Sequence, residues 1–187
     1  MAMQAVIMAG GAGMRLRPMT CDCPKPLVPL CGAPVMDYAL RLLARHGYDR
    51  ATATLCYRPQ DIKSAFGEGR HGVTLRYSEE KTPLGTAGSV KRCMSWLGEE
   101  DFLVISGDAV CDLDLSAALG FHRTSRAAAT AESSGTPTFW LTRNCASSII
   151  STITPHCNAE SSPFASAAAE RARKDASRRE SPSRSRS

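Results

Sequence analysis

The sequence lacks a Walker A loop, because no Gly-x4-Gly-Lys-Ser/Thr run occurs in its 187 residues. Its first glycine cluster also fails the dinucleotide fingerprint Gly-x-Gly-x-x-Gly, since no glycine follows Gly13 at the required offset. No apolar run is long enough to span a bilayer, and the first one is short and lacks the basic lead-in of a secretory leader. We therefore expect a cytoplasmic protein that does not associate with membranes.

Cysteine is present, but not in a pattern that indicates metal or disulfide chemistry. The eight cysteines are scattered along the chain. The one close pair, Cys21 and Cys23, is separated by a single residue, which does not match the ligand spacing of zinc sites. We expect all eight to be reduced thiols, most of them packed as small apolar side chains.

The net charge of +5 is unevenly spread along the chain. Residues 158–187 carry seven basic side chains against four acidic ones, and Ser, Ala and Arg supply 21 of the residues in this segment. Such a segment has too little apolar surface to offset the entropy of ordering a chain, so we expect a disordered tail. Its Ser-Arg repeats resemble a binding arm for nucleic acid or a phosphoprotein. However, no aromatic residues are interleaved with the basic ones, so we do not expect nucleic-acid binding.

The most informative segment lies at the start of the chain. An apolar run over residues 5–8 has the length of a buried strand. It stops at Gly10, Gly11 and Gly13, which permit φ > 0 and a close approach of the backbone to a ligand. Arg15 follows at once, and Lys25 stands ten residues later between two prolines. A strand that feeds a glycine turn beside two cations is typical of a polyphosphate site, whereas the plainer alternative is a tight turn with two solvated cations.

The first two-thirds of the chain alternates between strand and helix patterns, which predicts an α/β fold with a mostly parallel sheet. The ligand of such a sheet binds at the carboxyl ends of its strands. Thr86 and Asp114 are placed to cap helices, and Gly47 to end one. The further predicted strands are 51–57, 73–77 and 102–106, and the predicted helices are 34–46, 59–66, 86–97 and 115–124.

Residues 3–34 resemble the signature of the sugar-1-phosphate nucleotidyltransferases, which join a sugar 1-phosphate to a nucleoside triphosphate and release pyrophosphate. The matching residues are Gly10-Gly11-x-Gly13-x-Arg15-Leu16, Pro18, Thr20, Pro24-Lys25-Pro26 and Pro29. The resemblance implies a Rossmann-like, three-layer αβα fold, with Mg²⁺ as cofactor and a nucleoside triphosphate and a sugar 1-phosphate as partners. It implies these site residues: catalytic Arg15 and Lys25, nucleotide-binding Ala9, Gly10, Gly11, Gly13, Gly85, Thr86 and Gly107, and the metal ligand Asp108.

Two later segments extend the resemblance. Residues 84–88 read Leu-Gly-Thr-Ala-Gly, like the family segment whose glycine and threonine lie against the nucleobase and its ribose, although a plain glycine turn with a helix cap is the alternative. Residues 103–108 form an apolar strand that ends in Gly107 and Asp108, and in the family the matching aspartate is a metal ligand. The run 105–115 is most similar to the mannose-1-phosphate guanylyltransferases, which implies GDP-mannose synthesis from GTP. A glucose-1-phosphate uridylyl- or thymidylyltransferase is the alternative.

The resemblance ends near residue 130, and the family's later motifs, which contact the sugar phosphate and complete the metal site, are missing from the remaining text. We expect residues 1–130 to form the nucleotide-binding half of the domain, 131–157 to diverge and 158–187 to be the tail. The carboxyl-terminal part is then truncated or replaced, as a shifted reading frame would produce. We expect impaired turnover and a sheet without the strands that cover its far edge. A nucleotide-binding regulatory module without transferase activity is the alternative function, and the sequence does not indicate the oligomeric state.

Overall fold

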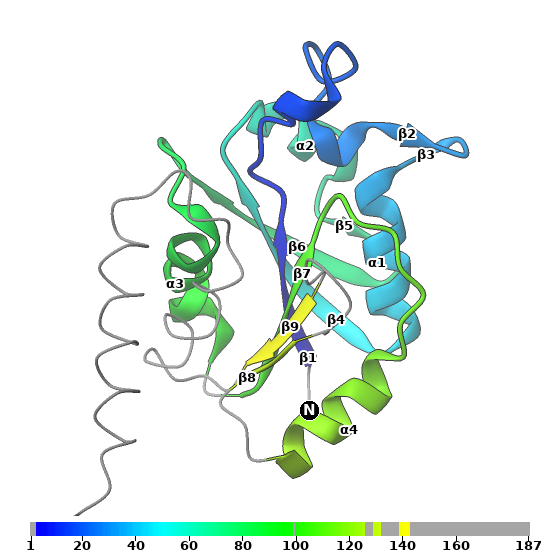
Figure 1. Ribbon diagram of the computed structural model, residues 1–187, viewed down its shortest axis with the longest axis vertical. Helices are drawn as coiled ribbons and strands as arrows, with labels where there is room; N and C mark the ends of the chain where they lie inside the picture. The colour runs from blue at the N-terminus through cyan, green and yellow to red at the C-terminus, as the bar shows by residue number, and fades with distance from the viewer. Residues whose placement is uncertain (1–2, 99, 126–128, 132–138, 143–187) are drawn as a thin grey trace, which may run out of the picture.

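The computed structural model describes residues 3–98, 100–125, 129–131 and 139–142, which build a seven-stranded sheet with helices on both faces (Figure 1). The strand order is β5-β6-β4-β1-β7-β9-β8. Strands β6, β4, β1 and β7 are parallel, whereas β5, β9 and β8 pair antiparallel with their neighbours. The strands are β1 (Met3–Met8), β4 (Tyr48–Leu55), β5 (Gly69–Arg70), β6 (Val73–Glu79), β7 (Phe102–Ser106), β8 (Ala129–Ala131) and β9 (Phe139–Thr142), with a separate ribbon of β2 (Pro29–Leu30) and β3 (Ala33–Pro34). The helices are α1 (Val35–Arg45), α2 (Pro59–Phe66), α3 (Gly85–Leu97) and α4 (Leu115–Ser125), with the 3-10 turns η1 (Met14–Leu16) and η2 (Lys25–Leu27).

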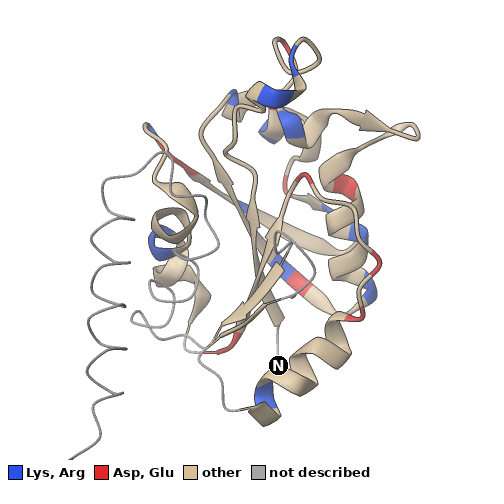
Figure 2. Ribbon diagram, viewed as in Figure 1, with Lys and Arg blue, Asp and Glu red and all other residues tan. Residues whose placement is uncertain are grey.

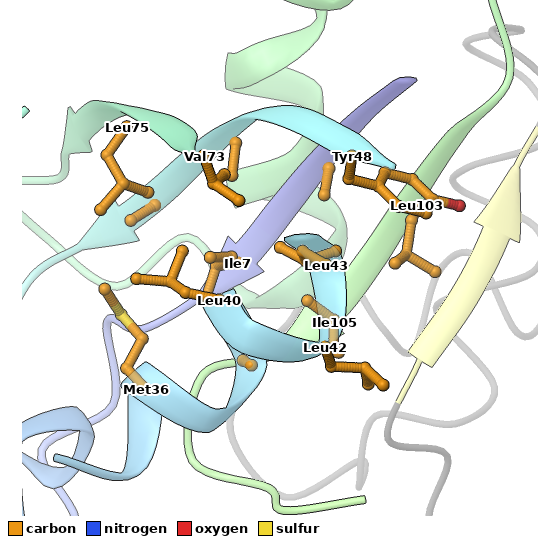
Figure 3. Close-up of a cluster of buried hydrophobic side chains, with 14 of the residues drawn as sticks. Ile7, Met36, Leu40, Leu42, Leu43, Tyr48, Val73, Leu75, Leu103 and Ile105 are labelled. Carbon is orange, nitrogen blue, oxygen red and sulfur yellow. The ribbon is translucent and has the colours of Figure 1, made fainter. Parts of the chain in front are cut away.

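Buried apolar side chains cover both faces of the sheet, so the fold has three layers. On one face, α1, α2 and α4 share a cluster with the strands that includes Leu40 of α1 and Ile7 of β1 (Figure 3). On the other face, α3 shares a second cluster with the strands, which includes Val90 of α3 and Val104 of β7. The predicted three-layer α/β fold with a mostly parallel sheet is thereby confirmed.

The strand order explains why the helices divide between the two faces. The chain runs from β1 through α1 to β4 and through α2 to β6, and then returns through α3 to β7 on the opposite side of β1. Parallel crossovers are almost always right-handed, so crossovers that run in opposite directions place their helices on opposite faces. The direction reverses at β1, and ligands of open α/β sheets bind at the carboxyl ends of the strands at such a point.

The expectation of a sheet without the strands that cover its far edge does not hold for β7. Strand β9 pairs antiparallel with β7, and β8 pairs with β9. All four residues of β9 are buried. Strand β9 was not predicted because its Phe-Trp-Leu-Thr run is short and is flanked by a Ser- and Thr-rich sequence. The predictions for residues 132–138 and 143–187, which include the tail and the shifted reading frame, lie outside the described residues.

Most of the predicted elements are confirmed to within a few residues. Gly47 follows α1 with a φ of 78°, as expected for a helix stop. The Asp114 carboxylate accepts a backbone N–H of α4 at 2.9 Å and so caps that helix. Thr86 is not a cap, because α3 already begins at Gly85 and Thr86 lies within its first turn.

Three other sequence features can be compared with the structure. Of the six cysteines that the structure describes, only Cys93 is buried, so the expected core packing of most cysteines is wrong among these six. Residues 67–72 also read Gly-x-Gly-x-x-Gly, yet they build the end of α2, β5 and the turn into β6 rather than a strand-to-helix loop. No helix in the described part of the chain has both the length and the apolar character to cross a membrane.

The carboxylate of Asp37 ties α1 to the β5–β6 edge of the sheet. Its side chain is 3% exposed, and it accepts a hydrogen bond from Arg41 Nε at 2.8 Å. His71 Nε2 lies 2.9 Å and Arg70 Nη1 3.5 Å from its other oxygen. Burial alone would raise the pKa of Asp37, but the hydrogen bonds and charges of His71 and Arg41 outweigh it and lower the pKa below the ordinary 3.8. Because α1 also packs against η2, this cluster supports the turn that carries Lys25.

Asp37→Asn should lower the free energy of unfolding by roughly 1.5–3 kcal/mol at neutral pH, because charge-assisted hydrogen bonds are lost from a buried position. Since folding lowers the pKa of this group, its contribution is present above the ordinary value of 3.8 and is lost as the pH falls through the folded value. Urea denaturation at neutral and at strongly acidic pH measures both effects. Asp49→Asn, which removes an exposed partner of Arg50, is the control. A difference from wild type that does not narrow in acid would contradict the prediction.

Candidate functional site

Three chain segments are fixed at the carboxyl edge of the sheet by single backbone hydrogen bonds beyond the strands. The Ala9 N–H donates to a β4 carbonyl at 3.1 Å, the Gly107 N–H to a β1 carbonyl at 3.0 Å and the Glu80 N–H to a β4 carbonyl at 2.7 Å. These bonds continue the sheet ladder by one step, so the residues that follow β1, β6 and β7 begin from defined positions. The predicted site residues that follow β1 and β7 therefore leave the same edge of the sheet from neighbouring strands.

The glycine turn, residues 10–13, follows β1. Gly13 has a φ of 62°, and a Cβ there would lie 2.9 Å from Cγ2 of Thr20. The buried Thr20 hydroxyl donates to the Gly13 carbonyl at 2.7 Å. A Cβ at Gly10 would lie 3.4 Å from the backbone nitrogen of Cys56, whereas one at Gly11 would meet nothing within 4 Å. Of the three glycines, only Gly13 adopts the positive φ that glycine permits, and a Cβ at Gly10 would make an ordinary van der Waals contact with Cys56.

Lys25 and Asp108 meet across this turn. The Lys25 ammonium forms an ion pair with Oδ2 of Asp108, and the Ser106 hydroxyl donates to Oδ1. Their side chains are 35% and 23% exposed, so both remain reachable by a ligand. The backbone of Lys25 is fixed because Lys25 begins η2. Pro26 of η2 is buried, and η2 packs against α1 and α2. The structure thus brings together two of the residues predicted from distant parts of the sequence.

Arg15 is placed differently. It lies on η1 within residues 14–23, a segment that we name the basic arm, which links the glycine turn to Lys25. Arg15 is exposed and makes no hydrogen bond or ion pair with any residue that the structure describes. Lys and Arg residues gather along this part of the molecule, at the top of Figure 2. The predicted second cation therefore lies on the loop that joins the glycine turn to Lys25, but it is not itself fixed at the sheet edge.

Glu80, just after β6, is a further candidate site residue that was not predicted from the sequence. It is 8% exposed, and Oε2 accepts the Leu84 N–H at 3.3 Å. Its Oε1 is buried without a hydrogen-bond partner among the described residues. Gly85, with a φ of 70°, and Thr86 follow in the first turn of α3. The sequence shows two adjacent glutamates where β6 ends, Glu79 in the strand and Glu80 after it. The sequence alone does not reveal that the second of them is buried.

The donors for a metal ion are few. No cluster of three or more His, Cys, Asp or Glu side chains occurs in the part of the chain that the structure describes. Asp108 offers one carboxylate, now neutralised by Lys25. Mg²⁺ commonly binds through one or two carboxylates, with water and substrate phosphates as its other ligands. The residues therefore fit a Mg²⁺ ion that arrives with a phosphate ligand better than a cation held by protein alone.

Comparison with known proteins identifies the family. The sequence profile described as Nucleotidyl transferase matches residues 4–138. The chain belongs to the nucleotidyl transferase family. The resemblance inferred from the glycine turn and the proline-framed lysine is thereby confirmed, and the matched region also includes β6, β7 and the segments after them.

Curated relatives of this chain differ in substrate. It is 38% identical over 140 residues to a UTP–glucose-1-phosphate uridylyltransferase of Synechocystis, with 68% of this chain and 36% of the relative covered. It is 36% identical over 124 residues to a mannose-1-phosphate guanylyltransferase of Mycobacterium tuberculosis, with 66% and 34% covered. The chain thus spans about a third of the length of these two relatives. Among solved structures, HddC from Yersinia pseudotuberculosis complexed with GMP-PN shares the fold, with a TM-score of 0.61, 22% identity, and 76% of this chain and 77% of that chain covered.

Gly107→Ala should disturb the site through packing. A Cβ at Gly107 would lie 2.9 Å from Cγ2 of Ile7 and 3.1 Å from the Met8 carbonyl oxygen, so the turn that carries Asp108 must shift. Overpacking of this kind costs about 1–3 kcal/mol of folding free energy. Gly11→Ala is the matched control, because its Cβ would occupy open space. Denaturant unfolding of both variants checks this, and equal stability would contradict the close packing at Gly107.

Proposed function

We propose that this chain binds a Mg²⁺–nucleoside triphosphate at the carboxyl edge of its sheet, as the nucleotide-binding half of an enzyme that joins a sugar 1-phosphate to the nucleotide. The observation that carries the proposal is the ion pair of Lys25 and Asp108 beside the glycine turn. It places one cation, one carboxylate and the free backbone of Gly11 at the topological switch point of the sheet. Family membership supports the same reaction class.

The reaction that the proposal implies is an in-line attack of a sugar 1-phosphate oxygen on the α-phosphorus, as the bond to pyrophosphate breaks. Both reactants are anions, so the obstacles are charge repulsion and orientation. Lys25 would neutralise charge at the α-phosphate and Arg15 at the leaving pyrophosphate, while backbone N–H groups of the glycine turn bind the phosphate chain. Mg²⁺ held by Asp108 would supply further neutralisation of phosphate oxygens.

The ion pair also suggests that metal and triphosphate binding are coupled. In the ligand-free chain Lys25 neutralises Asp108. If Mg²⁺ takes that place, the ammonium is released toward the phosphates, and the two cations no longer compete for one carboxylate. Each ligand then removes a cost from the binding of the other, which is positive coupling between the two binding events.

Lys25→Met and Arg15→Ala should each weaken GTP binding by ~10- to 100-fold, because each removes a charged hydrogen-bond donor to phosphate. Asp108→Asn should abolish the tightening of GTP binding by Mg²⁺ without weakening metal-free binding, because it also removes the carboxylate that competes with phosphate for Lys25. Titration calorimetry with and without Mg²⁺ measures these effects. Arg50→Ala, which removes a cation near the amino end of β4, is the control. Unchanged affinity in both cation variants, or an equal effect of Mg²⁺ on Asp108→Asn, would contradict the assignment.

Glu80 favours guanine as the base. Its buried Oε1 lacks a hydrogen-bond partner among the described residues, and Oε2 is tied to Leu84, beside the segment that resembles the family's base-binding sequence. A carboxylate only accepts hydrogen bonds. Guanine presents two adjacent donors, N1–H and N2–H₂, whereas uracil and thymine present one donor between two acceptors. The Oε1 atom is closed to solvent in the ligand-free chain, so a guanine base would reach it once the Glu80 side chain turns toward the ligand, and would then pair an oxygen that is costly to leave unpaired.

Glu80→Gln should move the base preference from GTP toward UTP, because an amide offers one donor and one acceptor, which complement uracil. We expect the ratio of GTP to UTP affinity to fall by ~10-fold or more, the effect of one lost hydrogen bond to a charged group. Competition of both nucleotides against a fluorescent analogue measures the ratio. Glu79→Gln, a neighbouring exposed glutamate that pairs with Lys63, is the matched control. The same ratio in wild type and Glu80→Gln would contradict base recognition by Glu80.

A further inference from the structure

The basic arm is an exposed loop that is closed at its base. The Thr20 hydroxyl donates to the Gly13 carbonyl at 2.7 Å, so the arm folds back onto the glycine turn. Beyond the arm, Lys25 has its own support in η2, which packs against α1 and α2. Arg15 lies inside the loop that the Thr20–Gly13 bond closes, on η1, where the Leu16 N–H donates to the Gly13 carbonyl at 2.9 Å. Its side chain makes no hydrogen bond or ion pair within the described chain. The position of the Arg15 side chain relative to the sheet edge therefore depends on how this closed loop as a whole is held.

Two consecutive residues of the turn between β4 and α2 contact the arm. Tyr57 Oη donates to the carbonyl of Cys21 at 2.9 Å, and Arg58 Nη1 donates to the carbonyl of Asp22. Arg58 also forms an ion pair through Nε with Asp61, in the first turn of α2. The guanidinium is thus fixed to the helix on one side and to the arm on the other. We name Tyr57 and Arg58 the arm clamp.

The backbone at Arg58 distinguishes this contact from ordinary turn geometry. Arg58 has a φ of 46°, in the left-handed region that glycine adopts without steric cost and that arginine rarely adopts. A glycine would therefore suit the turn itself. The arginine side chain offsets the backbone strain with bonds to Asp22 and Asp61, and the first of these lies on the arm.

We propose that Tyr57 and Arg58 are positioning residues for the nucleotide site, which hold the basic arm so that Arg15 lies within reach of the β- and γ-phosphates. This inference rests on the proposed function and adds residues from a segment outside the glycine turn and the metal carboxylate. It requires that loss of the clamp acts through Arg15. It also requires that Lys25, which η2 supports independently, is unaffected.

A double-mutant cycle tests the proposal with Mg²⁺–GTP and Mg²⁺–GMP as the probes. The clamp variant is Tyr57→Phe with Arg58→Gly, in which glycine keeps the left-handed backbone and only the side-chain contacts are lost. It should bind GTP ~10-fold more weakly, the effect expected for lost hydrogen bonds, and bind GMP, which lacks the β- and γ-phosphates, within ~2-fold of wild type. Combining Arg15→Ala with the clamp variant should lose no more GTP affinity than Arg15→Ala alone, whereas combining Lys25→Met with the clamp variant should multiply the two losses.

Amide hydrogen exchange of the ligand-free protein gives a second readout that needs no nucleotide. Exchange across residues 14–23 should become faster in the clamp variant and stay unchanged in Tyr77→Phe, a control that loses a similar hydroxyl-to-carbonyl bond at Gly67. The proposal would be overturned if the losses of GTP affinity caused by the clamp variant and by Arg15→Ala multiply in the combined variant. It would also be overturned if the clamp variant loses GTP and GMP affinity equally. So would unchanged exchange in the arm. Failure of the wild-type chain to bind GTP would instead overturn the proposed function, and the exchange experiment would still judge the clamp.

Discussion

The site depends on the meeting of Lys25 and Asp108, two charged side chains that approach from different sides of one strand. Lys25 arrives from the loop after β1, and Asp108 stands at the end of β7, which pairs with β1. They come together because the crossovers from β1 run first to one side of the sheet and then return to the other, which leaves the carboxyl end of β1 between them. The apolar clusters on the two faces keep that arrangement in place, and a side chain at Gly11 of the glycine turn would meet no atom within 4 Å.

Much of this arrangement was readable in the sequence. Apolar runs of strand length, followed by helical stripes and glycine stops, predicted the parallel core of the sheet, and Val73, Phe102 and Leu115 begin elements where expected. The glycine turn and the proline-framed lysine predicted the proposed phosphate site because their chemistry is local. Their spacing is carried by a few consecutive residues, so no tertiary contact was needed to recognise it.

The features that were missed depend on contacts between distant segments. Glu80 was one of two adjacent glutamates in the text, and only folding shows that it is buried with an oxygen unpaired among the described residues. Strand β9 has four residues and no periodicity to reveal it, and it is defined by pairing with β7. The arm clamp joins backbone carbonyls of one loop to side chains of another, and neither loop predicts its partner. The capping role of Thr86 was wrong for a related reason, since the helix start is set one residue earlier at Gly85.

Above all, we propose that a nucleotide binds where the strands β1, β6 and β7 end. The most direct test is to map backbone amide chemical shifts by NMR as Mg²⁺–GTP is added to the isotopically labelled chain. The claim predicts that the largest changes fall on residues 9–13, on Lys25 and on the segments at 80–86 and 107–108. The other glycine-rich segment, residues 67–72, lies in the β5–β6 region and should remain unchanged. Changes centred on residues 67–72, with the ends of β1 and β7 unaffected, would contradict the claim.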